Sequence, residues 1–323
     1  MYNHVLVPWV KPKRKLEAWY VSSRILYNTI KPFHFLILIK PVTHNRILII
    51  GASGFIGNTL YKELLPYYDV YGTYASQEGL FSENQVFFKF IAEENSIIEI
   101  LNEVRPSIII SAIKGDTKTV LKTHELLCNY VTKVDCRLIY ISCAHVFDAK
   151  GDFPSYEDDA PLAESLDGKL KLSVEKLIRQ LPKEKFVIAR LPFILGVTSP
   201  IIIQLKQAIK HQAAFEVFPS LIVSATTQSK VAQQIHYIIN KDLNGIFHLS
   251  SEDVMHHDEL FRDISEKISH KKPIFKNVFS RNDDHFLAIL PKVNLLPKNY
   301  RITLEEVIAD STLKDEIITL KAK

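Results

Sequence analysis

The segment from Gly51 to Gly57 has the residue types and the spacing of an anion-binding turn. Its sequence, GASGFIG, holds three of the chain's ten glycines and lies between a short apolar run and a helical stretch. In such a turn the first glycine permits a tight bend, the middle one lets a pyrophosphate approach the backbone, and the last lets the helix pack closely on the strand. Free N–H groups at the start of the helix would then attract the anion. The pattern predicts a dinucleotide site, and an ordinary glycine turn between a strand and a helix is the alternative.

The residues expected near the adenosine ribose favour NADP over NAD. An acidic side chain at the end of the second strand would bind the ribose hydroxyls and favour NAD. Here that end reads GTYASQ over residues 72–77, with no acid and no arginine. The lack of an acid removes the repulsion of a 2′-phosphate, to which Thr73 or Ser76 could donate. We therefore expect NADP, with NAD as the alternative.

Short apolar runs alternate with helical stretches from residue 46 onward. We predict strands at 46–50, 70–74, 86–90, 107–112, 137–142, 186–191 and 245–249, and helices at 55–65, 97–104, 117–132, 169–181, 201–211, 230–240 and 257–269. Continuous apolar strands such as RILII at 46–50 are typical of a parallel sheet that is covered on both faces. The alternation implies right-handed crossovers and an α/β fold, a Rossmann-type doubly wound parallel sheet.

The same pattern divides the chain into three parts. Residues 1–45 would be a basic and loosely ordered N-terminal extension, and 46–196 a Rossmann domain that binds NAD(P). The rhythm of strands and helices loosens after Pro192. We expect 197–323 to form a smaller C-terminal substrate lobe, interleaved with the Rossmann domain. Such a lobe would cover the carboxyl ends of the strands, where open α/β folds bind ligands.

The segment from Arg137 to Leu177 resembles the extended short-chain dehydrogenases/reductases. It reads as a strand, Ser-x-x-x-Val-Phe-Asp, an acidic loop with a proline, and Gly-x-x-Lys at the start of a helix. Within this family it is most similar to the dTDP-4-dehydrorhamnose reductase group, and RLPFILG at 190–196 and GIFHL at 245–249 resemble later strands of that group. The resemblance implies an NADP-dependent oxidoreductase that reduces a keto group on a nucleotide-linked deoxysugar, as in dTDP-rhamnose biosynthesis.

The resemblance also marks the catalytic positions. In these reductases a tyrosine protonates the substrate carbonyl, a lysine four residues later lowers the tyrosine pKa and holds the nicotinamide ribose, and a serine or threonine orients the carbonyl. Lys171 matches the lysine. Asp167 stands where the tyrosine is expected, and Cys143 stands where the serine or threonine is expected.

These two replacements weaken the expected proton donor. An ordinary Asp has a pKa of about 3.9, so donating a proton at pH 7 would need a rise of about 3 units, whereas a lysine one turn away lowers the pKa. Asp167 would more simply cap the helix or pair with Lys171. Cys143 is a weak donor, and a buried cysteine at a strand end needs no chemistry. Tyr156, His145 or a water are the alternative proton donors.

The glycine motif and the resemblance together assign the binding residues. For the cofactor they are Gly51, Ser53, Gly54, Phe55, Ile56, Gly57, Thr73, Tyr74, Ala112, Ile113, Ser142, Lys171, Leu191 and Pro192. For the substrate they are His145, Val146, Phe147 and Thr226, the last within SATT at 224–227. A plain polar loop is the alternative for that last segment.

Other polar clusters predict less. His256 and His257 precede an Asp-Glu pair, but adjacent histidines point to different faces of a helix and no H-E-x-x-H spacing occurs. We therefore expect a surface helix start there and no metal site. Three cysteines without a C-x-x-C pair argue against a disulfide scaffold or a zinc ribbon, and they fit a reducing cytoplasm.

Composition and charge exclude several classes of protein. The 323 residues are 47% hydrophobic and 24% charged, unlike disordered or fibrous chains. Through Arg46 there are eight Lys and Arg against one Glu, and the remaining 32 basic and 35 acidic residues leave the body slightly acidic. That balance argues against nucleic-acid binding. The apolar run at 35–39 is too short to span a membrane, and the basic segment around it could be an extension, a surface-associating segment or a targeting peptide.

Two functions remain open on this evidence. The first is a reductase of a nucleotide-sugar substrate, which could form a homodimer. The second is a cofactor-binding module without turnover, similar to the non-catalytic regulatory subunit of methionine adenosyltransferase, which shares this architecture. A third alternative, an epimerase or dehydratase, would depend on the same missing tyrosine.

Overall fold

The computed structural model describes residues 45–313 except 77, 95 and 280, and these residues belong to one compact unit. Apart from Asn45, the predicted extension over residues 1–45 lies outside them.

The strands are β1 Arg46–Ile50, β2 Asp69–Tyr74, β3 Phe87–Lys89, β4 Ile108–Ser111, β5 Arg137–Cys143, β6 Phe186–Leu191, β7 Phe193–Leu195, β8 Ala214–Val217, β9 Leu221–Val223, β10 Ala225–Thr227, β11 Gly245–His248, β12 Met255–His256, β13 Ile274–Asn277 and β14 His285–Leu287. The helices are α1 Phe55–Leu64, α2 Glu78–Phe81, α3 Ile97–Val104, α4 Thr117–Lys133, α5 Leu166–Ile178, α6 Pro200–His211, α7 Gln228–Asn240, α8 His257–Ile268 and α9 Leu304–Ser311, with 3-10 turns η1 Ala144–Phe147, η2 Lys183–Lys185 and η3 Lys298–Tyr300.

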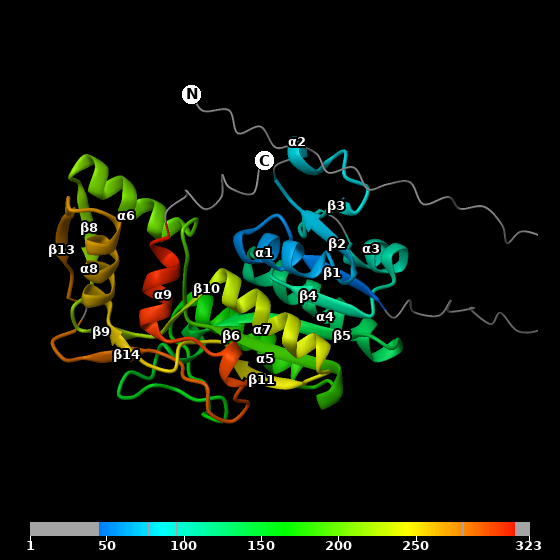
Figure 1. Ribbon diagram of the computed structural model, residues 1–323. Helices are drawn as coiled ribbons and strands as arrows, with labels where there is room; N and C mark the ends of the chain where they lie inside the picture. Colours follow the sequence, from blue (N-terminus) through cyan, green and yellow to red (C-terminus); the bar gives the residue numbers. More distant parts are fainter. Residues whose placement is uncertain (1–44, 77, 95, 280, 314–323) are drawn as a thin grey trace, which may run out of the picture. The chain divides into compact units, whose positions relative to one another are not determined.

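Seven strands form one parallel sheet, in the order β11-β6-β5-β4-β1-β2-β3 (Figure 1). The strand order reverses between β1 and β4, because the chain crosses from β3 to the other side of β1 before it continues. A reversal of this kind separates the loops on either side of it and leaves a crevice at the carboxyl ends of the strands. The topology confirms the predicted Rossmann-type doubly wound sheet.

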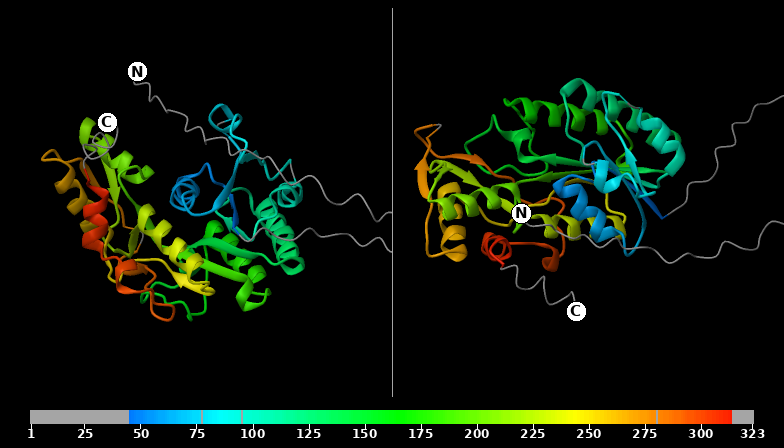
Figure 2. Two further views of the ribbon diagram at one scale, coloured as in Figure 1. Left: turned by 45° about the vertical axis from the view of Figure 1, so that its right-hand side comes forward. Right: turned by 90° about the horizontal axis from the view of Figure 1, so that it is seen from above.

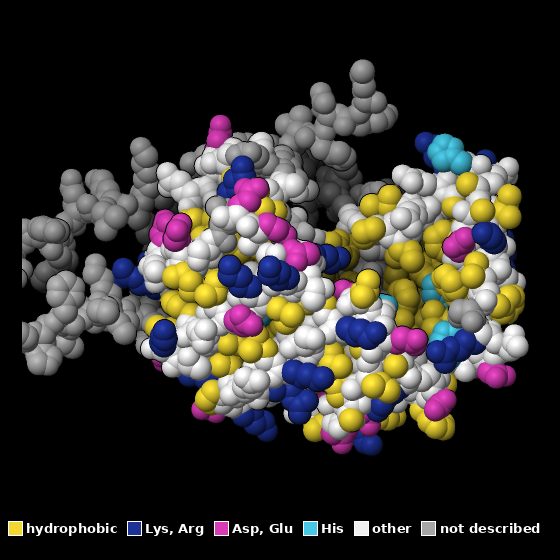
Figure 3. Space-filling view, turned by 180° about the vertical axis from the view of Figure 1, so that it is seen from behind, with side chains coloured by type: hydrophobic (Ala, Val, Ile, Leu, Met, Phe, Trp, Pro, Cys, Tyr) yellow, Lys and Arg dark blue, Asp and Glu magenta, His cyan; other side chains and the backbone are white. Residues whose placement is uncertain are grey.

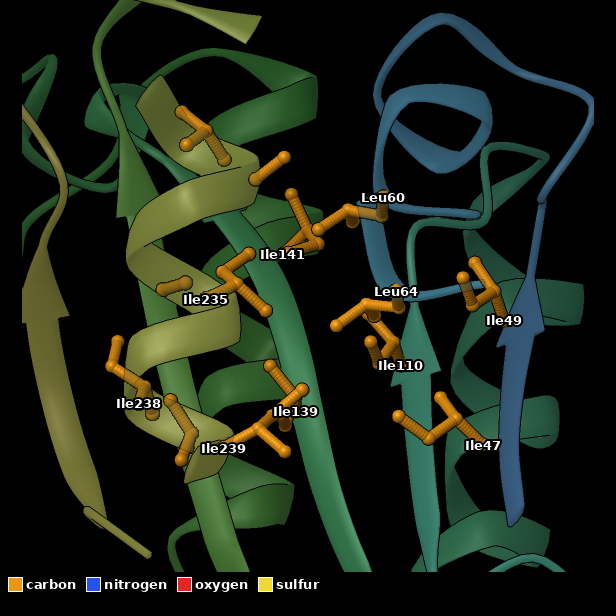
Figure 4. Packing of buried hydrophobic residues seen from close by; sticks show 14 of the residues in the cluster. Ile47, Ile49, Leu60, Leu64, Ile110, Ile139, Ile141, Ile235, Ile238 and Ile239 are labelled. Atoms are coloured by element: carbon orange, nitrogen blue, oxygen red, sulfur yellow. The ribbon is translucent and has the colours of Figure 1, made fainter. Parts of the chain in front are cut away.

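Helices cover both faces of this sheet (Figure 2). One face packs against α1 and α7, and Figure 4 shows side chains from this layer: Ile47, Ile49, Leu60, Leu64, Ile110, Ile139, Ile141, Ile235, Ile238 and Ile239. The alternate side chains of the same strands pack against α3, α4 and α5, among them Leu48, Ile50, Ile109, Leu138 and Tyr140. Because both faces are buried, these strands read as continuous apolar runs rather than as alternating ones.

The later part of the chain builds a smaller lobe around α6, α8 and α9. Its short strands pair as β7 with β10, β8 with β13, and β12-β9-β14. After β10 the chain returns to the main sheet through α7 and β11. The sequence did not predict the short strands of the lobe, because two to four residues are too few to show a period. Among the described residues, no helix is both long enough and apolar enough to cross a lipid bilayer.

Two local predictions are wrong. Helix α5 begins at Leu166 rather than at residue 169, because Ser165 caps it and accepts from Gly168 N at 3.0 Å. Asp167 therefore lies in the first turn and is not the cap. The start of α8 is not on the surface: His257 is buried among aromatic rings that include Phe218 and Phe261, and burial lowers its pKa to about 4.

A buried ion pair joins α5 to β6. Arg190 Nη2 lies 2.7 Å from Glu175 Oε2, and both side chains are at most 1% exposed. Ser142 Oγ donates to Glu175 Oε1 at 2.6 Å, and Arg190 Nη1 donates to His248 Nε2 at 3.3 Å. Since each charge is out of contact with water, each depends on the other for compensation.

Replacing Glu175 with Ala should lower the free energy of unfolding by about 3–5 kcal/mol, because it leaves the Arg190 guanidinium buried without a counter-ion. Urea unfolding followed by circular dichroism measures this, with the exposed Glu184→Ala as the matched control. The double variant Glu175→Leu with Arg190→Met should recover most of the loss. A Glu175→Ala protein as stable as its control would contradict the assignment.

Candidate functional site

The glycine turn between β1 and α1 is enclosed by neighbouring backbone. Gly51 has a φ of +86°, and its N–H donates to Thr73 Oγ1 at 2.9 Å. A Cβ at Gly51 would lie 2.9 Å from Ala112 O, and a Cβ at Gly57 would lie 2.1 Å from Gly51 O. At Gly54 the nearest atom to an added Cβ would be 3.3 Å away. The first and last glycines are thus required by packing, whereas the middle one leaves room beside the turn.

The start of α1 is open for an anion. Gly54 is the N-cap and supplies no side-chain hydrogen bond, and the first N–H groups of any helix have no partner within it. Phe55, Ile56 and Gly57, which carry those groups, line a cavity. Backbone donors and the helix dipole at one place fit a diphosphate.

That cavity has a volume of 680 Å³ and lies at the carboxyl ends of the sheet strands. Every residue predicted for the cofactor lines it: Gly51, Ser53, Gly54, Phe55, Ile56, Gly57, Thr73, Tyr74, Ala112, Ile113, Ser142, Lys171, Leu191 and Pro192. The predicted catalytic positions Cys143, Asp167 and Lys171 line it as well. On the face shown in Figure 3 the surface is hollowed, and mainly hydrophobic side chains line the hollow.

Sequence analysis missed several residues of this cavity. They are Ala75, Phe90, Ile91, Ala92, Glu93, Lys114, Gly115, Val120, Tyr140, Ile141, Leu170 and Ile194. The strand order could have predicted some of them. Because β4 pairs with β1, the segment after β4 must border the glycine turn. Glu93 adds a carboxylate to the cavity wall, and it follows β3 rather than β2, where the sequence predicted the ribose site. Of the two residues proposed to donate to a 2′-phosphate, Thr73 lies beneath the glycine turn, and Ser76 does not line the cavity.

Lys171 is fixed in the cavity by β5. Its Nζ donates to Ile141 O at 3.0 Å and lies 5.1 Å from the centroid of the Tyr140 ring. Burial lowers the pKa of Lys171, and the nearby Cys143 and Asp167 oppose that shift. In the described structure Lys171 does not form the direct ion pair with Asp167 that the sequence predicted, because its ammonium group is turned to the strand backbone.

Asp167 and Cys143 contact each other instead. Cys143 Sγ donates to Asp167 Oδ2 at 3.5 Å. Burial raises the pKa of Cys143 to about 12, so the thiol is neutral at pH 7. Cys143 is half-buried and Asp167 is exposed. The positions of the expected tyrosine and serine are therefore adjacent in space, as the resemblance implied, but they carry a thiol and a carboxylate.

Of the two alternative proton-donor residues, His145 lines the cavity and Tyr156 does not. His145 lies in η1, is half-buried and lines the cavity. Its ring, the Cys143 sulfur and the Asp167 carboxylate each offer a ligand atom, and these atoms all lie within 4.8 Å of one another. Tyr156 does not line the cavity, and its ring lies under Lys292 Nζ at 4.6 Å.

Three predicted substrate residues lie outside the cavity. Val146 and Phe147 are buried and pack with Ala144 and Ile289. In the short turn η1 the flanking side chains enter this core, so His145 alone of the predicted substrate residues reaches the cavity. Thr226 is fully buried in β10, opposite Ile194 of β7.

The buried His124 supports the cavity wall behind Tyr140. The His124 ring meets the Tyr140 ring edge-on, with centroids 5.0 Å apart. His124 Nδ1 lies 2.7 Å from Val120 O, and its Nε2 lies 3.0 Å from Ser111 Oγ. Since a carbonyl can only accept, Nδ1 carries the proton and Nε2 accepts from the serine. Burial lowers the pKa of His124 to about 4.

With this geometry established, the chain can be compared with known proteins. The family model described as the RmlD substrate binding domain matches residues 45–286. The chain belongs to this family. The match includes the glycine turn, the Cys143 to Lys171 segment and most of the smaller lobe, and it confirms the resemblance to the dTDP-4-dehydrorhamnose reductase group.

Curated relatives of this chain include methionine adenosyltransferase 2 subunit beta from three vertebrates. The Xenopus laevis protein is 31% identical over 165 residues, which is 48% of each chain. The Danio rerio protein is 26% identical over 166 residues, covering 47% of this chain and 49% of the relative. The chain thus spans about half the length of the curated relatives it matches.

Solved structures with the same fold are more distant in sequence. A dTDP-4-dehydrorhamnose reductase from Bacillus anthracis in complex with NADP is 21% identical with a TM-score of 0.64, covering 83% of this chain and 98% of that one. A UDP-glucose 4-epimerase from Thermotoga maritima with UDP-glucose is 18% identical with a TM-score of 0.69, covering 85% and 99%. These similarities establish the fold.

The buried His124 predicts a pH-dependent loss of stability. The pKa of His124 is about 4 in the folded protein and 6.5 in an unfolded chain. Its contribution to the free energy of unfolding is therefore complete above pH 6.5 and is lost as the pH falls toward 4. Between pH 7 and pH 4.5, the wild type should lose about 2–3 kcal/mol more than His124→Gln, which cannot titrate. Urea unfolding at the two pH values measures this, with the exposed His211→Gln as control. Equal losses in wild type and His124→Gln would contradict the buried, neutral state.

Proposed function

We propose that the chain binds a nicotinamide dinucleotide in the 680 Å³ cavity, with the diphosphate at the start of α1. The observation that carries this proposal is the open glycine turn. Gly54 adds no side chain to a helix start that borders the cavity. The reductase from Bacillus anthracis, which shares the fold, was crystallised with NADP, and the dTDP-glucose 4,6-dehydratase from the same organism was crystallised with NAD.

We propose NADP as the preferred form, with NAD as the alternative. The absence of an acid over residues 72–76 supports this choice, because a carboxylate there would repel a 2′-phosphate. Glu93 is an exposed carboxylate elsewhere in the cavity wall and is the residue that would oppose NADP. Titration with both coenzymes decides between them.

We further propose that the protein reduces a keto group on a nucleotide-linked deoxysugar. The family and the position of Lys171 support this activity. The bound coenzyme would supply the hydride. Lys171, held by Ile141 O, would orient the coenzyme ribose, and His145 or a water would supply the proton in place of the missing tyrosine. A homodimer and a cytoplasmic location stay predictions.

A second function is favoured by the curated relatives. A coenzyme-binding regulatory subunit would keep the glycine turn and Lys171 but would need no proton donor. The neutral Cys143 thiol fits such a protein, because a thiol is a weak proton donor, and the position of the expected tyrosine carries the exposed Asp167. Methionine adenosyltransferase 2 subunit beta is the relative that suggests it.

Coenzyme binding is tested by calorimetric titration with NADPH and NADH. The Gly54→Ala variant should bind NADPH at least about tenfold more weakly, because its methyl group enters the space that the diphosphate needs. An added Cβ there would lie 3.3 Å from Gly51 O, so the turn needs to shift by only a few tenths of an ångström and the variant should fold. Gly79→Ala, which meets nothing within 4 Å, is the matched control. Wild-type affinity in Gly54→Ala would contradict the proposed diphosphate site.

Catalysis is tested separately by restoring the expected residues. NADPH oxidation would be followed with a panel of 4-keto nucleotide sugars. The double variant Asp167→Tyr with Cys143→Thr should raise the rate by roughly 10²–10⁴ if the cavity accepts the sugar, because it restores a general acid beside Lys171. Binding of NADPH without turnover in either protein would favour the regulatory function instead.

A further inference from the structure

The three side chains that replace or flank the expected catalytic pair all carry groups that can bind a metal ion. Cys143 closes β5, His145 follows in η1, and Asp167 lies in the first turn of α5. Their sulfur, nitrogen and oxygen atoms lie within 4.8 Å of one another. We propose that Cys143, His145 and Asp167 form a binding site for a zinc-type divalent cation at the wall of the cavity. The sequence predicted no metal here, because Asp167 lies 22 residues after His145 and the three residues form no contiguous ligand motif.

The distances fit a tetrahedral ion. Zinc binds sulfur at about 2.3 Å and carboxylate oxygen at about 2.0–2.2 Å, which places two such ligands about 3.6 Å apart across a tetrahedron. Cys143 Sγ and Asp167 Oδ2 are 3.5 Å apart. They therefore already have the separation of two ligands of one ion. The His145 ligand nitrogen lies within 4.8 Å of both atoms, so a shift of about an ångström brings it to the separation of a third ligand.

The backbone holds the two ligand-bearing segments together. Gly168, next to Asp167, packs so closely that a Cβ there would lie 2.2 Å from His145 O. Asp148, which follows η1, accepts from the N–H groups of Glu164 and Ser165 just before α5. The start of α5 is thus fixed against the strand end and turn that carry the other two ligands. Preorganisation of this kind lowers the cost of binding.

The ligands are also free to bind. No hydrogen bond to another described residue uses a ring nitrogen of His145, and the Asp167 carboxylate is exposed. On binding, the Cys143 thiol proton would pass to solvent as the sulfur–metal bond forms. The Lys171 ammonium is held at Ile141 O. The negative charges of the Cys143 thiolate and the Asp167 carboxylate would reduce its repulsion of a bound dication.

The ligand chemistry selects the class of cation. One thiolate, one imidazole and one carboxylate suit zinc or cobalt(II), whereas magnesium prefers oxygen ligands alone. Three protein ligands leave a fourth position open, as in catalytic zinc sites. All three ligands line the cavity, so the fourth position would be accessible from it. The carbonyl oxygen of a substrate could bind there, so that the metal would polarise it in place of the missing tyrosine. That consequence rests on the proposed reductase function, whereas metal binding itself does not.

Cobalt(II) titration of the tag-free full chain tests the site. We expect a thiolate-to-cobalt charge-transfer band, intense visible bands of a tetrahedral ion, and loss of both on adding zinc. Cys143→Ser should abolish the charge-transfer band. Cys128 and Cys136 are buried and cannot supply it. His145→Gln and Asp167→Asn should each weaken cobalt binding by about 10–100-fold or more.

Matched controls separate the site from surface binding. His211→Gln and Asp152→Asn alter exposed residues outside the cavity and should leave cobalt affinity unchanged. The free energy of unfolding in urea, followed by circular dichroism, checks that each variant is folded without relying on the cavity. Cobalt bound without a charge-transfer band, or with an affinity that the three ligand variants do not change, would overturn the proposal. A cobalt spectrum without NADPH oxidation would support the metal site and count against the reductase.

Discussion

The close approach of backbone atoms around the glycine turn constrains the rest of this structure. A side chain at Gly57 would meet the carbonyl of Gly51, and one at Gly51 would meet the carbonyl of Ala112. Helix α1 can therefore lie against β1, and β4 can lie beside β1, without a gap. The same closeness brings the start of α1 to the carboxyl ends of the strands. The cavity is the space that this arrangement leaves open.

Much of the fold was predictable because burial on both faces leaves a strong trace in the sequence. Strands such as β1 and β4 are continuous apolar runs, and turns or prolines end the helices between them. The parallel, doubly wound arrangement of the sheet follows from that alternation and from right-handed crossovers. The smaller lobe was not predictable in the same way. Its strands are short, and their partners come from distant parts of the chain, so neither period nor proximity identifies them.

The site was predictable to the extent that it depends on backbone position. Gly51, Gly54, Gly57 and Lys171 line the cavity because the turn and the helix register place them there. Some residues that were predicted because they neighbour a site residue in the sequence do not line the cavity. Val146 and Phe147 neighbour His145, yet the direction of a side chain in a 3-10 turn decides which residue faces the cavity. The contact between Cys143 and Asp167 joins two segments 24 positions apart, and sequence spacing alone could not reveal it.

The chain of buried polar contacts that starts at Ser142 has a consequence for how the molecule comes apart. From that serine it runs through Glu175 and Arg190 to His248, whose Nδ1 donates to the carbonyl of Leu290 in the last third of the chain. Ser142, Glu175, Arg190 and His248 are all buried. Separating the late segment from the sheet would leave the buried His248 N–H without its acceptor, so this segment and the sheet should unfold together.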